Sequence, residues 1–141
     1  PTTPTNPLFP RSLIAIWPLE MPGTHPTVLL RHSLPDGTHH FDWMLARDGS
    51  GPLLTFRLAV DISQGIQHFS GPLLPDHRRR YLDYEGPISG DRGRVDRVGG
   101  GVCDILLEEL GQVRIRVDLG SLKGEVHGHA ASDGQFMFGL H

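Results

Sequence analysis

The sequence is poor in the features that would assign it to several common classes of protein. Cys103 is the only cysteine among 141 residues, which excludes a disulfide within the chain and makes a reducing compartment the expectation. It contains no run of about 18 apolar residues, so no membrane-spanning helix and no membrane partner are expected. The net charge of −3 argues against non-specific coating of nucleic acid, although a few arginines in one cleft can still bind phosphate.

The first residues, PTTPTNPLFP, also lack the basic and apolar regions of a secretory signal peptide, so we expect a cytoplasmic protein. Their proline and threonine content predicts an irregular arm over residues 1–11. Residues 12–141 show no domain-sized change in composition. This length suits a single domain with its own core, which we expect to be a monomer.

Glycine and proline, in contrast, are abundant, with 18 and 12 copies. They interrupt the chain often enough to predict short strands and frequent turns rather than long helices. The clearest strand is QVRIRVDL (112–119), in which Val113, Ile115 and Val117 alternate with polar residues. A period of two is typical of a half-buried strand.

Short apolar segments bounded by glycine, proline or aspartate predict about eight to ten strands and an all-β fold, a compact antiparallel β-barrel or sandwich. Asp36-Gly37 supplies a hairpin signal between two of them. The segment at 102–110 also fits a helical turn. The expected strands are 12–19, 27–32, 38–46, 53–60, 81–86, 93–95, 102–110, 112–119, 122–129 and 135–141.

The stretch HHFDWML (39–45) contains the first chemical motif. In an extended strand His40 and Asp42 share one face, whereas His39 lies on the other, aromatic face. An imidazole and a carboxylate so placed suit Mn²⁺ or Zn²⁺, and the preceding hairpin can bring His32 in as a third ligand. Three ligands would leave positions open for water and substrate. The alternative is that a chain with nine histidines contains such a spacing by chance.

The second chemical stretch is PDHRRRYLDYEGPISGDRGRV (75–95). Three consecutive arginines are usually a solvated surface run. Here they adjoin His77 and Tyr81, which can donate hydrogen bonds to a phosphate oxygen, and arginine adds charge and a bidentate fork. The stretch lacks the ending of a Walker-type phosphate loop. The arginines are Arg78, Arg79 and Arg80.

Other candidate residues give weaker signals. His127 and His129 alternate onto one face with Glu125 and form a second possible ligand set, near which nothing supplies substrate contacts. His68 is expected in a surface loop. Cys103 stands in an apolar run, which is typical of a buried small hydrophobic residue rather than a nucleophile.

Taken in order, the stretches RH, HHFD, PDHRRRYLDYEGPISGDRGRV and LKGEV resemble the 3′-phosphoesterase domain of bacterial DNA ligase D, also called the DNA polymerase ligase N-terminal domain. The resemblance covers residues 27–138, and YLDYEGPISG is its most specific element. It implies a compact β-barrel that trims 3′ ends of DNA in break repair. Such domains remove a terminal ribonucleoside and then the 3′-phosphate, with manganese as the preferred metal.

By that resemblance, His32, His40 and Asp42 match the metal ligands of the family. The expected cofactor is therefore a divalent metal, Mn²⁺ foremost, with Zn²⁺ as the other possibility. His77 and Tyr81 match the residues that contact the scissile phosphate and are the catalytic candidates. Further phosphate-binding candidates are Arg78 and Arg80.

The chain departs from the family pattern at several positions. The metal motif of the family continues as H-x-D-x-R, and Met44 stands at the arginine position. The lysine and arginine that family members place before the third motif have no clear match, since Arg57 is basic but stands at a different point. We therefore expect a stand-alone, divergent member, whose substrate is a DNA 3′ end or another phosphate ester and which has possible repair partners. The alternatives are a non-catalytic relative that binds a phosphate-bearing ligand or nucleic-acid end, and a structural barrel with incidental histidines.

Overall fold

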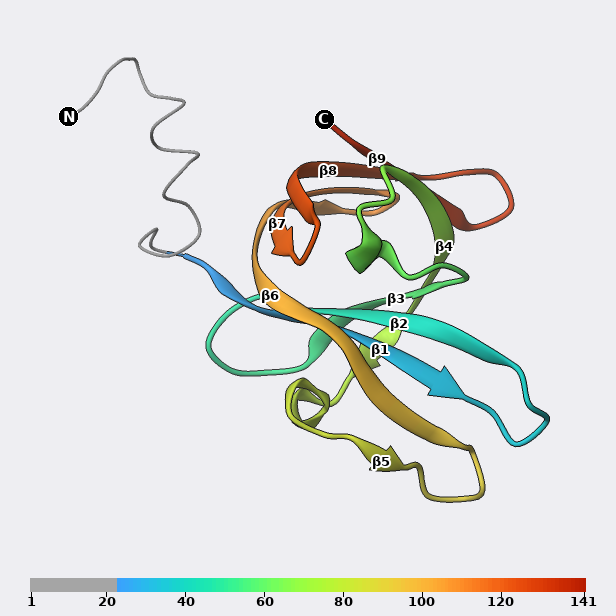
Figure 1. Ribbon diagram of the computed structural model, residues 1–141. Helices are drawn as coiled ribbons and strands as arrows, with labels where there is room; N and C mark the ends of the chain where they lie inside the picture. Colours follow the sequence, from blue (N-terminus) through green and yellow to red (C-terminus); the bar gives the residue numbers. More distant parts are fainter. Residues whose placement is uncertain (1–22) are drawn as a thin grey trace, which may run out of the picture.

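The computed structural model describes residues 23–141, which form nine β-strands and two short 3₁₀ helices (Figure 1). The predicted arm at 1–11 and the predicted strand at 12–19 lie outside the described residues. Neither helix of the described part has the length and apolarity needed to cross a membrane. The elements are β1 (His25–Ser33), β2 (His39–Ala46), β3 (Leu53–Leu58), η1 (Ile62–Gln64), β4 (His68–His77), η2 (Arg79–Leu82), β5 (Gly86–Pro87), β6 (Arg94–Glu109), β7 (Gln112–Leu119), β8 (Leu122–Ala130) and β9 (Gln135–Leu140).

The strands pair in one antiparallel sheet that closes on itself. The strand order is β1-β2-β3-β4-β9-β8-β7-β6-β5, and β1 also pairs with β6, which joins the two sides of the sheet. The prediction of a compact, all-β antiparallel barrel is therefore confirmed. Closure matters physically because an open edge would expose unpaired backbone N–H and C=O groups.

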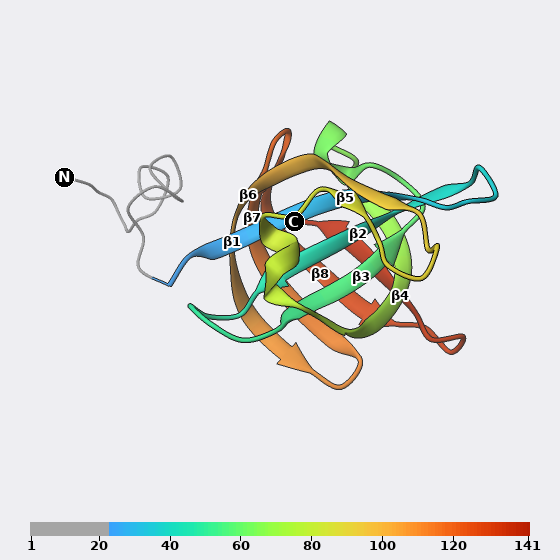
Figure 2. The ribbon, with the colours of Figure 1, turned by 90° about the horizontal axis from the view of Figure 1, so that it is seen from below.

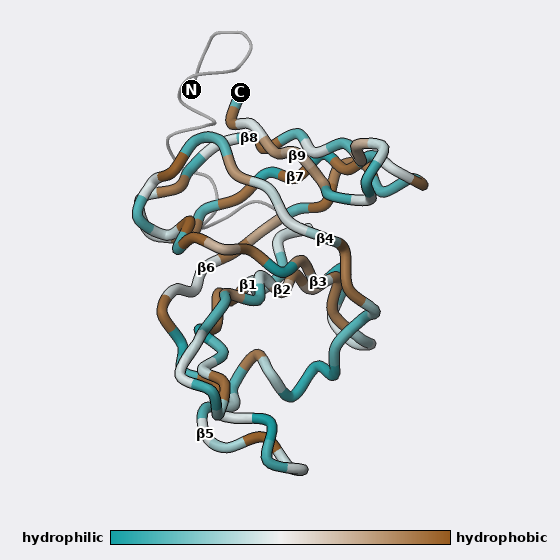
Figure 3. The backbone as a smooth tube through the Cα atoms, turned by 90° about the vertical axis from the view of Figure 1, so that its right-hand side faces the viewer, coloured by the Kyte–Doolittle hydropathy of each residue, from teal (hydrophilic) through white to brown (hydrophobic). Residues whose placement is uncertain are grey.

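Alternate residues of the strands fill the interior of the barrel, and Figure 3 shows this alternation as changes between brown and teal along the tube. Trp43 of β2 is fully buried, and its ring meets those of Phe69 and Phe138 nearly edge to face, with centroids 5.9 and 5.8 Å apart. Its indole N–H donates to Thr27 Oγ1 at 3.0 Å, which satisfies the one polar atom of the side chain. The apolar face predicted for residues 112–119 points into the same core.

A second apolar cluster, called the outer cluster below, lies on the other face of β1, β2 and β3. The segment from η2 to β5 covers it. Figures 1 and 3 show β5 on the opposite side of β1–β3 from β7–β9, and in Figure 2 η2 lies in front of these strands. The buried members of the outer cluster are Val28, Leu30, Met44, Ala46, Leu53, Leu82 and Val95.

The covering segment differs from its prediction. The predicted strand at 81–86 is wrong, since this stretch contains the end of η2 and the approach to β5. Tyr81 and Tyr84, three residues apart, both pack against the outer cluster. Tyr81 lies in η2 and Tyr84 two residues beyond its end, and their spacing of three differs from the spacing of two that a shared face of a strand requires.

Strand β4 was missed by the sequence prediction, which left residues 61–80 as loop. Pro72 and Pro75 lack the backbone N–H groups that a regular ladder uses, so the segment does not read as a strand. Its pairing with β3 is accordingly irregular and includes a register shift between Leu53 and Thr55. The more regular pairing is with β9 on its other side. His68, expected in a loop, is the first residue of this strand.

Strand β6 joins two segments that the sequence presents separately, 93–95 and 102–110. It pairs with β1 and with β7 through register shifts that allow it to bend. At Gly101 a Cβ atom would lie 1.9 Å from the carbonyl oxygen of Asp118, so only glycine permits this close approach of β7. The segment at 102–110 is therefore part of a strand and not a helical turn.

Candidate metal centre

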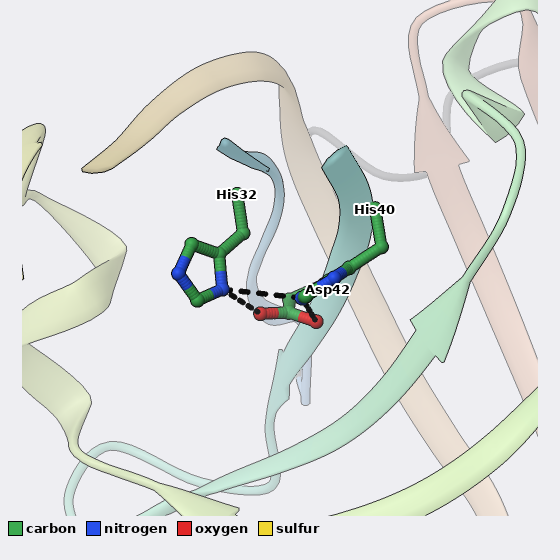
Figure 4. Close-up of side chains that lie close together, drawn as sticks. All are labelled: His32, His40 and Asp42. Carbon is green, nitrogen blue, oxygen red and sulfur yellow. Dashed lines mark hydrogen bonds and ion pairs between the residues drawn. The ribbon is translucent and has the colours of Figure 1, made fainter. Parts of the chain in front are cut away.

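The three metal-ligand candidates lie together on the outer face of β1 and β2, beside the outer cluster (Figure 4). His32 and His40 are direct partners in the register of the two strands, and Asp42 follows two residues farther along β2. The intervening turn contains Asp36-Gly37, where the positive φ of Gly37 (89°) makes the tight connection. The structure thus brings together the residues that the hairpin signal and the alternation predict.

The distances between the ligand atoms suit a shared cation. His32 Nδ1 lies 3.1 Å from His40 Nε2 and 3.8 Å from Asp42 Oδ2. His40 Nε2 lies 3.5 Å from Asp42 Oδ1. Ligand atoms bound at about 2.1 Å from one ion lie about 3 Å or slightly more from each other. Small side-chain movements would therefore be enough for the cluster to hold an ion.

The hydrogen bonds of the two histidines determine which ring nitrogen could bind an ion. His32 Nε2 lies 2.7 Å from the carbonyl oxygen of Arg92, and because a carbonyl only accepts, Nε2 holds the hydrogen. The lone pair of His32 then stays on Nδ1, which faces the cluster. Burial lowers the pKa of His40, an effect that Asp42 opposes and Arg57 strengthens. The lowered pKa favours the neutral ring of His40. Because His32 Nδ1 carries a lone pair, their 3.1 Å contact is a hydrogen bond that His40 Nε2–H donates, and ligation through Nε2 would require this hydrogen to move to His40 Nδ1.

Asp42 is the least satisfied polar group of the cluster. Its side chain is 4% exposed, yet Oδ1 has no hydrogen-bond partner among the described residues. A buried carboxylate oxygen without a partner is costly, so such groups normally accept hydrogen bonds or bind cations. The chemistry of two imidazoles and one carboxylate fits Zn²⁺ and also Mn²⁺.

Arg57 is the residue whose place the sequence reasoning missed. The β2–β3 register puts it directly opposite Asp42, and its Nε lies 3.5 Å from Asp42 Oδ1 in an ion pair that lacks hydrogen-bond geometry. Counting residues in equal steps outward from the turn RDGSGP pairs Ala46 with Leu53, and four steps farther it pairs Asp42 with Arg57. The sequence of this hairpin could therefore have predicted that Arg57 lies beside Asp42. The guanidinium therefore reaches the cluster from β3.

Met44, at the arginine position of the family motif, has a different environment. It is 1% exposed and belongs to the outer cluster with Val28 and Leu30. The same face of β2 therefore changes from polar at His40 and Asp42 to fully apolar at Met44. An arginine at this position would have to bury its charge among aliphatic side chains.

The phosphate-binding candidates line a separate cleft of about 600 Å³. The rings of His77 and Tyr81 meet there with centroids 6.1 Å apart, and the Arg80 guanidinium lies 4.5 Å from the centre of the Tyr84 ring. Arg79 instead donates to the carbonyl oxygens of Asp48 and Gly51. The candidates that line the cleft are His77, Arg78, Arg80 and Tyr81, together with Tyr84 and Arg92.

The cleft and the metal candidates are neighbours rather than one continuous site. Arg92 connects them, because its carbonyl oxygen contacts His32 while the residue also lines the cleft. His32, His40 and Asp42 are not among the described residues that line the cleft. His77 pairs with Leu53, at the end of β3 remote from Arg57, and its Nδ1 contacts the Pro75 carbonyl oxygen at 2.9 Å.

His39 and Cys103 lie where their sequence patterns predict. His39 is exposed and meets the Phe41 ring edge-on, with centroids 5.4 Å apart, at the rim of the aromatic face. Cys103 is fully buried, and burial raises its pKa to about 12, which keeps it a thiol. A buried thiol of this kind is a packing residue and not a nucleophile.

No protein-family model matches this chain, and a search of curated proteins finds no match. The motif resemblance to the ligase D phosphoesterase domain therefore stands on the residues quoted for it. Any function has to be argued from the site itself.

Proposed function

We propose that this protein is a metal-dependent phosphoesterase whose ion is held by His32, His40 and Asp42. The observation that supports this proposal is the buried Asp42 carboxylate, which faces two imidazoles and whose Oδ1 lacks a hydrogen-bond partner among the described residues. A bound divalent cation, Mn²⁺ or Zn²⁺, supplies Lewis acidity toward a phosphate oxygen and lowers the pKa of a bound water.

The residues around the cluster have distinct roles in this proposal. Arg57, beside Asp42, offers a guanidinium to the phosphate oxygens, which compensates for the apolar Met44. His77 and Tyr81 line the adjoining cleft, so in this proposal they donate hydrogen bonds to the leaving group of a substrate that extends into that cleft. Arg78 and Arg80 hold the neighbouring part of a negatively charged substrate.

The motif resemblance selects the substrate class within this proposal, a DNA 3′ end with a 3′-phosphate or a terminal ribonucleoside. A role in DNA break repair, with repair proteins as partners, follows from that substrate. The proposed setting is the cytoplasm, where the one thiol, Cys103, stays reduced and buried.

The direct test supplies the purified protein with Mn²⁺ and DNA that ends in a 3′-phosphate or a 3′-ribonucleotide. Asp42→Asn and His40→Ala are each expected to lower the cleavage rate by roughly 100-fold or more, because each removes a metal ligand. His39→Ala is the matched control, since this neighbouring histidine lies on the other face of β2. Equal rates in His40→Ala and His39→Ala would sink the proposal.

Metal binding has its own readout in the melting temperature. An ion that binds only the folded state at 100 times its Kd stabilises the protein by about 2.7 kcal/mol. We expect Mn²⁺ or Zn²⁺ to raise the melting temperature of the wild type and of His39→Ala, but not that of Asp42→Asn. An unchanged melting temperature in the wild type would count against the metal site.

A second candidate function is a non-catalytic protein that binds a phosphate-bearing ligand or a nucleic-acid end. The observation that favours it is the separation of the cationic cleft from the three metal candidates. This function predicts that 3′-phosphorylated DNA binds without metal, that Arg80→Ala weakens the binding, and that no cleavage occurs with Mn²⁺. Fluorescence anisotropy with labelled DNA measures the binding directly.

A further inference from the structure

A second group of histidines lies on the outer face of β4, β9 and β8. Four of the nine histidines in the chain line a hollow of about 460 Å³ there. None of the four belongs to the His32–His40–Asp42 cluster, and nothing proposed above uses them. The four are His68, His127, His129 and His141.

Gly139 of β9 lies at the centre of this group. The register pairs it with His68 on β4 and with His127 on β8. Met137 and His141 lie two residues to either side along the chain and share its face of the sheet. Three histidines and one methionine are therefore neighbours of a position that has no side chain of its own.

The ring of His68 already lies beside this open position, whereas the rings of His127 and His141 stack on each other. His68 Nδ1 is the described atom nearest to the place that a Cβ on Gly139 would take, at 3.4 Å. His127 Nε2 lies 2.7 Å from Glu125 Oε2, a carboxylate that holds the ring in the tautomer with its lone pair on Nδ1. His141 stacks on His127 with ring centroids 3.8 Å apart, and its backbone N–H donates to the Glu125 carbonyl oxygen.

We propose that this face binds a copper ion over Gly139, with the imidazoles of His68, His127 and His141 and the thioether of Met137 as its ligands. Imidazole suits both copper and zinc, but a thioether is a soft ligand that favours copper, and copper binds most tightly in the order of divalent metals. Binding requires the His141 ring to turn out of its stack on His127 and the His127 ring to turn toward Gly139. Side chains that are not buried change between rotamers readily.

The test is a copper titration of the Asp42→Asn variant, in which the His32–His40–Asp42 cluster lacks its carboxylate. Calorimetry measures the stoichiometry, and electron paramagnetic resonance of Cu²⁺ reports nitrogen ligands. We expect one equivalent of Cu²⁺ with several nitrogen ligands. His68→Gln and His127→Gln should each weaken its binding by roughly tenfold or more. His25→Gln is the matched control because His25 lies at the start of β1, outside both histidine groups.

Gly139→Val provides a steric test that leaves all four ligands in place. The φ of Gly139 is outside the left-handed region, and a Cβ there would make only ordinary contact with His68. The variant should therefore fold, which circular dichroism checks, while its side chain takes the place of the ion. We expect Gly139→Val to lose copper binding, and Met137→Leu to weaken Cu⁺ more than Cu²⁺.

Two results would overturn this inference. One is the lack of a copper equivalent in Asp42→Asn, and the other is copper binding that is unchanged in His127→Gln and Gly139→Val. Neither result affects the phosphoesterase proposal, since both sites have separate residues. Conversely, the effect of Mn²⁺ on the melting temperature should be the same in His127→Gln as in the wild type.

Discussion

The two faces of strand β2 contrast, although both belong to one run of eight residues. The inner face is apolar along most of its length and packs in the barrel core around Trp43. The outer face begins with His40 and Asp42 and ends with Met44 and Ala46 in the outer cluster. Because successive side chains point to opposite faces, Phe41 and Trp43 pack in the core on either side of Asp42 in the chain. Rigid placement of the site thus depends on the apolar residues between its members.

The largest expected effect comes from breaking the inner face. Trp43→Ala removes a fully buried ring from contact with Phe56, Phe69 and Phe138, so the free energy of unfolding should fall by roughly 3–5 kcal/mol. Denaturation in urea measures this loss. Trp43→Phe keeps an aromatic ring and should cost less. A loss below about 1 kcal/mol in Trp43→Ala would contradict the interpretation of this face as the core.

The next effect tests the apolar end of the outer face. Met44→Arg introduces the arginine that the ligase D motif has at this position, but it buries a charge in the outer cluster. Stability should therefore fall by roughly 2–4 kcal/mol without a gain in the proposed phosphoesterase activity. Met44→Leu, which keeps the volume, should cost less than about 1.5 kcal/mol. Urea denaturation and cleavage of 3′-phosphorylated DNA are the two measurements. A more active and equally stable Met44→Arg protein would show that the position is open to the site.

The smallest expected effect tests the polar end of the outer face, at Arg57 opposite Asp42. Arg57→Gln removes a positive charge beside the metal candidates, so affinity for Mn²⁺ should rise by roughly a few-fold. The same change removes a phosphate ligand, so the cleavage rate should fall by roughly 10- to 100-fold. Calorimetry measures the affinity for Mn²⁺, and a cleavage assay measures the rate. Arg57→Lys keeps the positive charge, so both quantities should change less than in Arg57→Gln. A fall in both quantities would indicate that Arg57 only supports Asp42 structurally.

Local pattern was enough to predict a large part of the fold. The alternation in residues 112–119 predicts β7 with the bounds that the structure shows, and β2 and β8 agree with prediction to within one residue at either end. The prediction of strands failed in two segments, 68–77 and 81–86, whose residues do not show the alternation of a regular strand. Strand β4 was not predicted because it contains two prolines. The tyrosines of 81–86 do not belong to a strand and instead pack over the outer cluster.

The candidate metal centre likewise contains residues that local sequence predicts and residues that it does not. A hairpin signal and an H-x-D spacing are local, so His32, His40 and Asp42 could be predicted to meet from the sequence. Arg57 needed the register of the next hairpin. The separation of His77 and Tyr81 from the metal candidates depends on the path of η2 across the barrel, which no local spacing describes.

By itself, the sequence determined which side chains share a face of each strand, because the period of two follows from backbone geometry within the strand. Only the tertiary structure decided which faces meet. The closure of β1 onto β6 and the placement of His68 and His127 on either side of Gly139 bring together residues far apart in the chain. Such pairings follow from the order of strands in the closed sheet, which is a property of the whole barrel and not of any one segment.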